Sequence, residues 1–577
     1  MLTNNFNATL KKFKEMKKSL VIILLVNVIS TFTARVASGQ TESLLTKIDS
    51  LVANQLSEDL PGGAIAVISN NGIIYKNTLG VMDVEQNLKI NENTLFDLAS
   101  VAKQFTAYAT GMLEQEGEID LDEDIRKYLG DLPDYEHRIT VRHLLQHTSG
   151  IASTDWLRIM IGSSFDEVWS HNDEIKLLKQ YSQLNFKPNT QHVYSNGGYS
   201  FLASIVEEVS GMSFADFLNQ RIFKPLGMET ALVNARPDLR LANDAIGYEI
   251  VEGKPVKVSS TTDYSYGSGN VWANLSDMIK WGQNFLSPKV GNAEMINRIF
   301  SKYNTLDNGD SISYTYGFFV REYKGIKLVM HQGGVPGFRN YLMIFPNDNL
   351  VITAHFNNES INAWGIVNGI ADIVLSNKIE EKPAKPRIEV ALNVEKAKQF
   401  AGTYELADGM ELTFKVEQDT FWLVLPDDDK FQLFAEDDYN FFLKAFNAQC
   451  TFTKSENGEV DQMVWHQSGR SFNGSRVGDR VELSIDEIER FAGRYIQSDL
   501  NMEYPITFND GRLYVHTPST FKKYFGIEKL ELTHMSGDKF TTSRLGTLVF
   551  TRDENSKVNG FMMPELGRLQ NVRFELL

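Results

Sequence analysis

The sequence predicts a multidomain protein: an α/β domain whose antiparallel sheet is flanked by helices, followed by two small all-β modules. At 577 residues the chain exceeds one ordinary hydrophobic core, so two to four domains are expected. Strand-like segments lie at both ends of the first part and helices lie between them, which is typical of one sheet built from both ends. A repeated segment near the C-terminus predicts the two β modules.

The first domain begins with a predicted helix over residues 41–56 and a β-hairpin. Two apolar runs, 64–69 and 73–80, flank Asn70-Asn71-Gly72, which is a strong hairpin signal. Apolar residues at helical spacing predict a helix from Ser100 that Gly117 ends. The remaining predicted elements are helices at 140–147, 199–209, 275–285 and 362–376, and strands at 326–331, 341–345 and 350–355.

A charged, proline-bearing linker separates this domain from the duplicated part. Phe400-Ala-Gly-Thr-Tyr404 and Phe491-Ala-Gly-Arg-Tyr495 end two matching segments, each followed by short alternating strands and turn signals. We expect two barrel-like modules with these aromatic residues in their cores. The predicted units are a signal peptide at 1–39, a first domain at 40–378, a linker at 379–392 and β modules at 393–483 and 484–577.

The N-terminus is typical of an export signal. Five lysines between residues 11 and 18 precede an apolar run at 20–29, and the small residues Ala37-Ser38-Gly39 follow. The apolar run is too short to span a bilayer comfortably. We expect an exported, soluble, periplasmic or extracellular protein without a stable membrane span after cleavage. The alternative is an uncleaved N-terminal anchor, and Met16 is an alternative start.

Charge and cysteine content exclude several classes of function. The formal net charge is −17, which argues against nucleic-acid binding and against docking on an anionic membrane. The single cysteine, Cys450, leaves no internal disulfide and no zinc–cysteine cluster.

Ser100 and Lys103 are the first candidate functional residues. A spacing of three places both on one helix face, about one turn apart, and backbone N–H groups at a helix start can stabilise an oxyanion. Lysine becomes a useful base when burial lowers its pKa. Ser519–Lys522 and Ser536–Lys539 fit the same Ser-x-x-Lys pattern, so the pattern needs partners elsewhere in the chain.

Tyr194 and Asn196 supply such partners. A tyrosine beside a lysine can act as general base to a serine and then protonate the leaving group. The asparagine amide can donate to a substrate carbonyl and accept from its amide. Tyr75-Lys-Asn77 also fits Tyr-x-Asn, but it lies on the first hairpin, upstream of Ser100.

The third element is His331-Gln332-Gly333-Gly334 at the end of an apolar strand. Gly333 would let a substrate backbone approach closely, and the Gly334 N–H could pair with the Ser100 N–H as an oxyanion hole. His331, cationic or neutral, could orient Tyr194 or attract a carboxylate. A purely structural histidine at a strand end is the alternative.

Together, and in this order, the three elements resemble the serine β-lactamase and penicillin-recognising family. The resemblance covers about residues 45–378 and points to the branch of class C β-lactamases, DD-carboxypeptidases, D-aminopeptidases and esterases. It implies Ser100 as acylated nucleophile, Lys103 and Tyr194 as acid/base pair, Asn196 as ligand of the substrate amide, and Ser100 and Gly334 as oxyanion donors. The resemblance implies no metal and no cofactor.

One departure from the family pattern bears on the substrate. β-Lactamases of this branch usually carry Lys-Thr-Gly or Lys-Ser-Gly where this chain has His331-Gln332-Gly333, and histidine there resembles the D-aminopeptidase and esterase-type members. We therefore expect a serine hydrolase that acts through an acyl-enzyme on small peptides with D-amino acids, small esters or peptidoglycan-derived substrates. The alternatives are a β-lactamase and a catalytically silent cell-wall-binding member. The C-terminal modules resemble barrels that flank or restrict the cleft in D-aminopeptidase-like members. The oligomeric state stays open.

Overall fold

The computed structural model describes residues 44–577 except 165, 238–240, 259–261, 302–303, 381–386, 407–410, 426–428, 455–459, 468–469, 478–482, 520, 523–525 and 543. The predicted signal segment at 1–39 lies outside the described residues, as does much of the charged linker. None of the described helices is both long and apolar enough to cross a membrane.

The first domain is built around a seven-stranded antiparallel sheet of described residues, with strand order β12-β13-β14-β15-β16-β1-β2. The N-terminal hairpin thus joins strands that lie more than 200 residues later in the chain. The strands are β1 (Gly63–Ser69), β2 (Gly72–Leu79), β12 (Tyr314–Thr315), β13 (Phe318–Tyr323), β14 (Ile326–Val335), β15 (Phe338–Phe345) and β16 (Leu350–Phe356).

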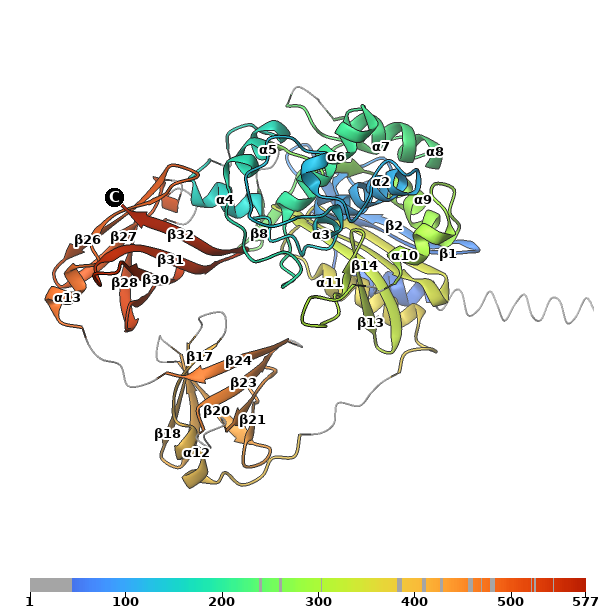
Figure 1. Cartoon of the computed structure of the whole chain (residues 1–577). Helices are drawn as coiled ribbons and strands as arrows, with labels where there is room; N and C mark the ends of the chain where they lie inside the picture. Colours follow the sequence, from blue (N-terminus) through green and yellow to red (C-terminus); the bar gives the residue numbers. More distant parts are fainter. Residues whose placement is uncertain are drawn as a thin grey trace, which may run out of the picture.

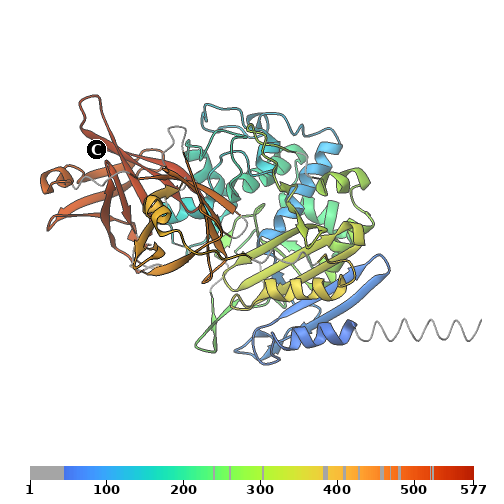
Figure 2. The same cartoon turned by 90° about the horizontal axis from the view of Figure 1, so that it is seen from below.

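Strand alternation divides the core of this domain into two layers. Along β1, Ala64, Ala66 and Ile68 pack on the side of the helical middle, whereas Ile65 and Val67 pack on the opposite side. A helix over residues 44–53 and α11 (Ala363–Val374) cover the opposite side (Figure 2). The sheet is therefore buried on both faces, and the predicted fold class is confirmed.

Helices of the middle segment cover the face that carries the candidate residues. α2 packs on α6, and α9 packs on β1 and β16. Their bounds are η1 (Ala99–Ala102, a 3₁₀ turn), α2 (Lys103–Gln115), η2 (Ile125–Lys127), α3 (Val141–Leu145), α4 (Thr154–Met160), α5 (His171–Gln180), α6 (Asn196–Ser210), α7 (Phe214–Leu218), η3 (Asn219–Phe223), α8 (Lys224–Leu226), α9 (Leu275–Leu286) and α10 (Ala293–Ile299).

Short strand pairs and turns complete the first domain. They are β3 (Val81–Asp83) with β4 (Leu88–Lys89), β5 (Phe96–Asp97) with β11 (Val271–Ala273) and β7 (Leu232–Val233), β6 (Trp169–Ser170) with β10 (Asp263–Tyr264), β8 (Tyr248–Val251) with β9 (Lys254–Lys257), and the turn η4 (Pro346–Asp348).

The duplicated part forms two closed barrels, each of eight strands among the described residues, and each follows a short helix. The first has α12 (Val394–Phe400), β17 (Gly402–Leu406), β18 (Glu411–Glu417), β19 (Thr420–Val424), β20 (Lys430–Ala435), β21 (Asn440–Leu443), β22 (Ala448–Thr453), β23 (Gln462–Gln467) and β24 (Arg470–Arg476). The second has α13 (Ile485–Glu489), β25 (Gly493–Gln497), β26 (Met502–Asn509), β27 (Arg512–His516), β28 (Lys529–Ser536), β29 (Lys539–Thr542), β30 (Gly546–Arg552), β31 (Val558–Leu566) and β32 (Leu569–Leu576).

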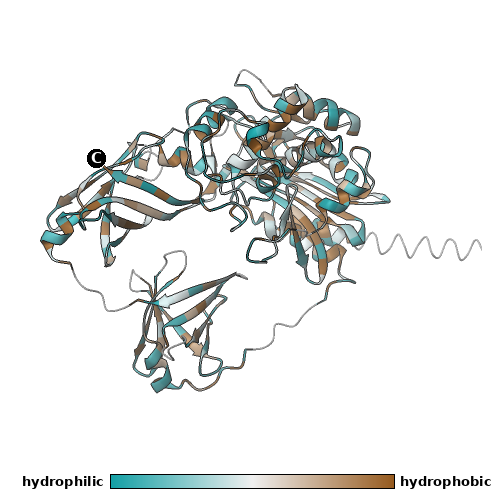
Figure 3. Cartoon of the chain, viewed as in Figure 1, coloured by the Kyte–Doolittle hydropathy of each residue, from teal (hydrophilic) through white to brown (hydrophobic). Residues whose placement is uncertain are grey.

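Aromatic side chains fill both barrels. The predicted core residues Phe400, Tyr404, Phe491 and Tyr495 are all buried, and the Phe400 ring stacks on Phe452 with centroids 4.6 Å apart. Cys450 is free and buried in the first barrel. Figure 3 shows hydrophobic residues along the strands of the sheet and barrels. The barrel interiors are therefore packed cores.

The two barrels differ in how they meet the first domain. The first barrel has a hydrophobic core of its own, whereas the core of the second is continuous with that of the helical middle. Figure 1 shows the β31–β32 hairpin of the second barrel reaching toward α4. Lys539 and Glu405, 2.6 Å apart, join the two barrels.

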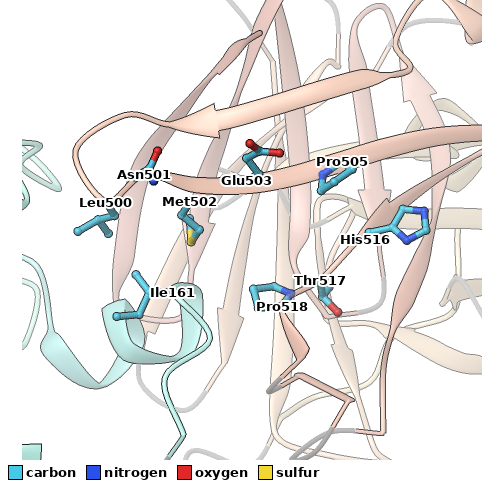
Figure 4. A pocket seen from close by; sticks show the side chains of 9 residues that line it. All are labelled: Ile161, Leu500, Asn501, Met502, Glu503, Pro505, His516, Thr517 and Pro518. Carbon is cyan, nitrogen blue, oxygen red and sulfur yellow. The ribbon is translucent and has the colours of Figure 1, made fainter.

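A cavity of about 430 Å³ lies where α4 meets the second barrel (Figure 4). Its lining comes from the end of α4 and from the barrel: Ile161, Leu500, Asn501, Met502, Glu503, Pro505, His516, Thr517 and Pro518. None of the residues predicted to carry chemistry lines it.

Candidate active site

Ser100 lies in the 3₁₀ turn η1, which continues directly into α2. The turn is entered through Ala99, whose φ of +50° is left-handed, and the Ala99 N–H donates to Asp97 Oδ1 at 2.9 Å. Burial raises the pKa of Asp97 to about 6. The predicted helix over 100–117 is present, but its first turn is 3₁₀. Ser100 therefore stands at a helix N-terminus, half-buried, with backbone N–H groups around it.

Lys103 is fully buried one turn after Ser100. Its Nζ donates to Asn196 Oδ1 and to the Ser268 carbonyl oxygen, both at 2.8 Å, and lies 3.4 Å from Ser100 Oγ. Burial lowers the pKa of Lys103 well below its usual value, and the positive charge of Arg568 lowers it further. A neutral amine has two N–H groups and one lone pair. Because both N–H groups have acceptors at 2.8 Å, the lone pair is left for Ser100.

Tyr194 lies beside Lys103, whose Nζ is 4.7 Å from the centre of the Tyr194 ring. The hydroxyl is buried and has no hydrogen-bond partner among the described residues. Burial raises the pKa of Tyr194, and the nearby Ser100 hydroxyl opposes part of that rise. Tyr194 therefore keeps its proton at neutral pH, and its hydroxyl is free to bond with a substrate.

Asn196 begins α6, three residues earlier than the predicted helix start. Ser195 is the N-cap, and its hydroxyl accepts from the Gly198 N–H at 3.1 Å, which draws Gly197 and Gly198 into the first turn. The Asn196 side-chain oxygen accepts from Lys103, so its NH₂ group remains to donate to a substrate carbonyl.

His331 is buried on β14 and hydrogen-bonds to Tyr314 rather than to Tyr194. Its Nδ1 lies 2.6 Å from the Gln332 carbonyl oxygen, so Nδ1 carries the proton, and Nε2 accepts from the Tyr314 hydroxyl at 3.0 Å. Burial lowers the pKa of His331 to about 3. The imidazole is neutral at physiological pH and supplies no positive charge for a carboxylate.

Gly333 brings β14 against η1, the turn that carries Ser100. A Cβ at this position would lie 2.3 Å from the Leu98 carbonyl oxygen and 3.0 Å from the Ser100 backbone nitrogen. The space that the glycine leaves is thus filled by the Ser100 turn itself, whereas the sequence suggested an approaching substrate. Gln332 and Gly334, which flank it, are exposed. Gly334 is the next residue of β14 after Gly333. Its N–H therefore belongs to the part of the strand that lies next to Ser100.

His147, for which no role was predicted, holds the Tyr194 loop. The Ser195 N–H donates to His147 Nδ1 at 3.1 Å, and the imidazole packs against Tyr194 with ring centroids 4.2 Å apart. Burial lowers the pKa of His147 well below its usual value. The signal was present as the His147-Thr-Ser-Gly150 stretch after a helix. Asp155 and Arg568, which lie near Tyr194, carried no such signal.

The two other Ser-x-x-Lys matches lie in the second barrel, away from these residues. Ser519 is exposed, and Lys522 forms an ion pair with Glu528 at 2.7 Å. Lys539 pairs with Glu405. The described residues contain no group of three or more His, Cys, Asp or Glu side chains placed to hold a metal ion.

Comparison with known proteins gives matches over both parts of the chain. A family model described as beta-lactamase matches residues 44–365, and one described as a domain of unknown function (DUF3471) matches residues 386–478. The chain is 28% identical over 415 residues to penicillin-binding protein 4* of Bacillus subtilis, covering 68% of this chain and 90% of that protein.

A second relative is the D-aminopeptidase of Brucella anthropi, 29% identical over 300 residues, which cover 52% of this chain and 56% of that enzyme. Among solved structures, the octameric penicillin-binding protein homologue from Pyrococcus abyssi superposes with a TM-score of 0.52 at 22% identity. The match covers 75% of this chain and 99% of that one, and it shows a shared fold.

Proposed function

We propose that this chain, which belongs to the beta-lactamase family, is an exported serine hydrolase that acts through an acyl-enzyme at Ser100. Relatives in this family are serine hydrolases, and one of them is named a D-aminopeptidase. The proposed substrates are amides or esters, in particular peptides that contain D-amino acids and small esters. Export rests on the lysine-rich, apolar N-terminal segment of the sequence.

The observation that carries the proposal is the set of contacts around the Lys103 amine. Both N–H groups of a neutral amine are held by Asn196 Oδ1 and the Ser268 carbonyl, so the lone pair remains for the Ser100 hydroxyl at 3.4 Å. Because burial lowers the pKa of Lys103 well below its usual value, the amine in this position gives up its proton more readily and can act as general base to Ser100.

The proposed reaction has two stages. Lys103 takes the Ser100 proton as Oγ attacks the substrate carbonyl, and the N–H groups of Ser100 and Gly334 stabilise the oxyanion. Tyr194 donates its phenolic proton to the leaving nitrogen or oxygen, and the proton from Ser100 replaces it by way of Lys103. The NH₂ group of Asn196 binds the substrate amide. Water then releases the acyl group by the reverse proton movements.

His331 has a supporting role in this proposal. The neutral imidazole joins β14 to Tyr314 through a hydrogen bond. The ring centroids of Tyr314 and His147 are 4.5 Å apart, and His147 in turn holds the Tyr194 loop. His331 is thus a positioning residue of the Tyr194 side of the site and not a ligand of the substrate.

The test compares wild type with Ser100→Ala and the matched control Ser519→Ala. The proteins are treated with a fluorescent fluorophosphonate and then assayed with D-aminoacyl amides, a D-Ala-D-Ala peptide and nitrophenyl esters. Wild type and Ser519→Ala should take one label and turn over at least one substrate, whereas Ser100→Ala should do neither. Absence of both label and turnover in wild type would sink the proposal and favour a silent cell-wall-binding protein. A chromogenic cephalosporin in the same assay tests the alternative β-lactamase activity.

A further inference from the structure

The turn at the tip of the β31–β32 hairpin is docked on the helical middle beside the candidate site. Leu566 pairs with Leu569, so Gly567 and Arg568 form a two-residue turn. Gly567 lies flat against Trp156 of α4, because a Cβ there would be 2.1 Å from the indole. This contact leaves no room for a side chain at Gly567.

Hydrogen bonds to backbone groups and to small side chains hold the hairpin in place. Asn185 Nδ2 donates to the Arg568 carbonyl oxygen at 2.8 Å, and Asn185 Oδ1 accepts from the Gln570 N–H at 2.9 Å. The Ser182 N–H and hydroxyl both donate to Asp499 Oδ2 at 2.8 Å. These contacts dock the barrel through groups other than the Arg568 guanidinium.

The Arg568 guanidinium extends from this docked turn over the candidate site. Its central carbon lies 4.9 Å from the centre of the Tyr194 ring, and Nη1 lies 3.6 Å from Asp155 Oδ2. The guanidinium makes no hydrogen bond within 3.5 Å to any side chain or backbone group among the described residues. The Arg568 and Asp155 side chains are 42% and 39% exposed, so their ion pair contributes little.

The groups around Arg568 are already occupied or neutral. Asp155 Oδ1 accepts from the Ser153 hydroxyl at 2.5 Å, and Ser153 Oγ accepts from the Asn196 N–H at 3.2 Å. Lys103 is engaged by its own partners, and His331 is neutral. The guanidinium is thus a positive group with free donors within reach of a substrate that contacts Tyr194.

We propose that Arg568, supplied by the second barrel, is a specificity-determining residue that binds a carboxylate of the substrate through two parallel N–H donors. This assignment rests on the proposed hydrolase function and names its substrate class. The carboxylate displaces the loosely held Asp155 from Arg568. It belongs either to the leaving group, as in a peptide with a free C-terminal D-amino acid, or to the side chain of the acyl group.

The test uses two pairs of substrates that differ only in a carboxylate or a carboxamide. N-acetyl-D-Ala-D-Ala and its C-terminal amide test the leaving group, and the p-nitroanilides of D-glutamate and D-glutamine test the acyl side. Wild type should prefer the carboxylate member of one pair by about 10- to 100-fold in kcat/KM. Arg568→Gln should remove most of that preference, and Arg568→Lys should keep part of it.

Two further variants sharpen the test. Asp155→Asn removes the competing carboxylate and should increase the preference. Arg573→Gln is the matched control, because Arg573 is an exposed arginine on the same hairpin, and it should leave the preference unchanged. Fluorophosphonate labelling of Ser100 and a thermal melt for each variant report whether the site is folded.

The outcomes separate this assignment from the proposed function. Labelling and turnover without a carboxylate preference in either wild-type pair would overturn the role of Arg568 and leave the hydrolase intact. An equal fall for both members of a pair in a folded Arg568→Gln protein would also overturn it. Absence of labelling in wild type would overturn both proposals.

Discussion

Gly333 lies so close to Ser100 that a Cβ on the glycine would be only 3.0 Å from the backbone nitrogen of the serine. The same Cβ would lie 2.3 Å from the Leu98 carbonyl oxygen, a distance that real Cβ contacts do not reach. Strand β14 therefore sets the position of the Ser100 turn directly.

Gly333→Ala should reduce kcat/KM by at least about 100-fold, because the methyl group must displace the Ser100 turn from β14 by an ångström-scale shift. Steady-state kinetics and the rate of fluorophosphonate labelling check this result. Gly334→Ala is the comparison, since a Cβ there meets its nearest atom, Arg339 Nη1, only at 3.6 Å. That variant should lose far less, and equal losses in the two variants would contradict the packing argument.

Tyr194→Phe should lower kcat by about 10²- to 10⁴-fold, because it removes the proposed proton donor to the leaving group. Its hydroxyl has no hydrogen-bond partner among the described residues, so the midpoint of urea unfolding should hardly change. Tyr199→Phe is the contrasting variant: it removes a buried hydrogen bond to the Leu145 carbonyl oxygen and should lower stability. A Tyr194→Phe protein with wild-type kcat would exclude the phenol from proton transfer.

The pH dependence of kcat/KM should report the state of Lys103. Burial lowers its pKa, so the rise in activity with pH, as the amine loses its proton, should be complete well below the usual value of 10.5. Lys103→Arg should lose activity across the whole pH range, because arginine stays protonated. Lys522→Arg in the second barrel provides the control. A rise centred near pH 10.5 in wild type would show that Lys103 is not held neutral.

The protein should lose stability as the pH falls below 6.5. Burial lowers the pKa of His171, His331 and His355 from 6.5 to about 3, so between these values the unfolded chain binds protons that the folded chain does not. Each histidine then removes about 1.4 kcal/mol of unfolding free energy per pH unit as the pH falls. Asp97, Glu174, Glu207 and Asp244, whose pKa values burial raises, act in the opposite direction. Burial also lowers the pKa of His143, His147 and His192, so the histidines are the larger group.

Urea unfolding at about pH 7.5 and about pH 5 measures this dependence. His355→Gln should reduce the slope of unfolding free energy against pH by the share of one proton, because it removes one of the buried histidines. An unfolding free energy that stays constant across this range would mean that the folded and unfolded chains take up equal numbers of protons, which contradicts the prediction.

Much of the fold could be predicted because its determinants are local. The Asn70-Asn71-Gly72 turn predicted the β1–β2 hairpin, and the helix predicted at 275–285 is α9, which Asn274 caps. The pairing of β1 with β16 was less accessible, because antiparallel register across nearly 290 residues leaves no local trace in the sequence. The helix start at Asn196 was missed because two glycines, which usually break helices, follow Asn196.

The residues of the candidate site that belong to sequence motifs could be predicted. Those whose state or position depends on tertiary packing could not. The Lys103 amine lies close to the side chains of Ser100, Tyr194 and Asn196, and the order of the motifs in the sequence suggested this grouping. The neutral state of His331 depends on burial and on Tyr314, which no sequence pattern reported. A role for Arg568 could not be predicted, because a single arginine in a β-turn looks like any surface residue in the sequence. Only the docking of the second barrel places it beside Tyr194.

The docked hairpin also determines when the candidate site is complete. β32 closes the second barrel by pairing with β25, and Arg568 lies in the turn directly before β32. Ser100 and the Arg568 guanidinium are thus 468 positions apart in the chain, and they come together only because the β31–β32 hairpin docks on the helical middle. The candidate site therefore has its full set of charges only when the second barrel is docked, and a chain with an undocked barrel would present Ser100 without Arg568.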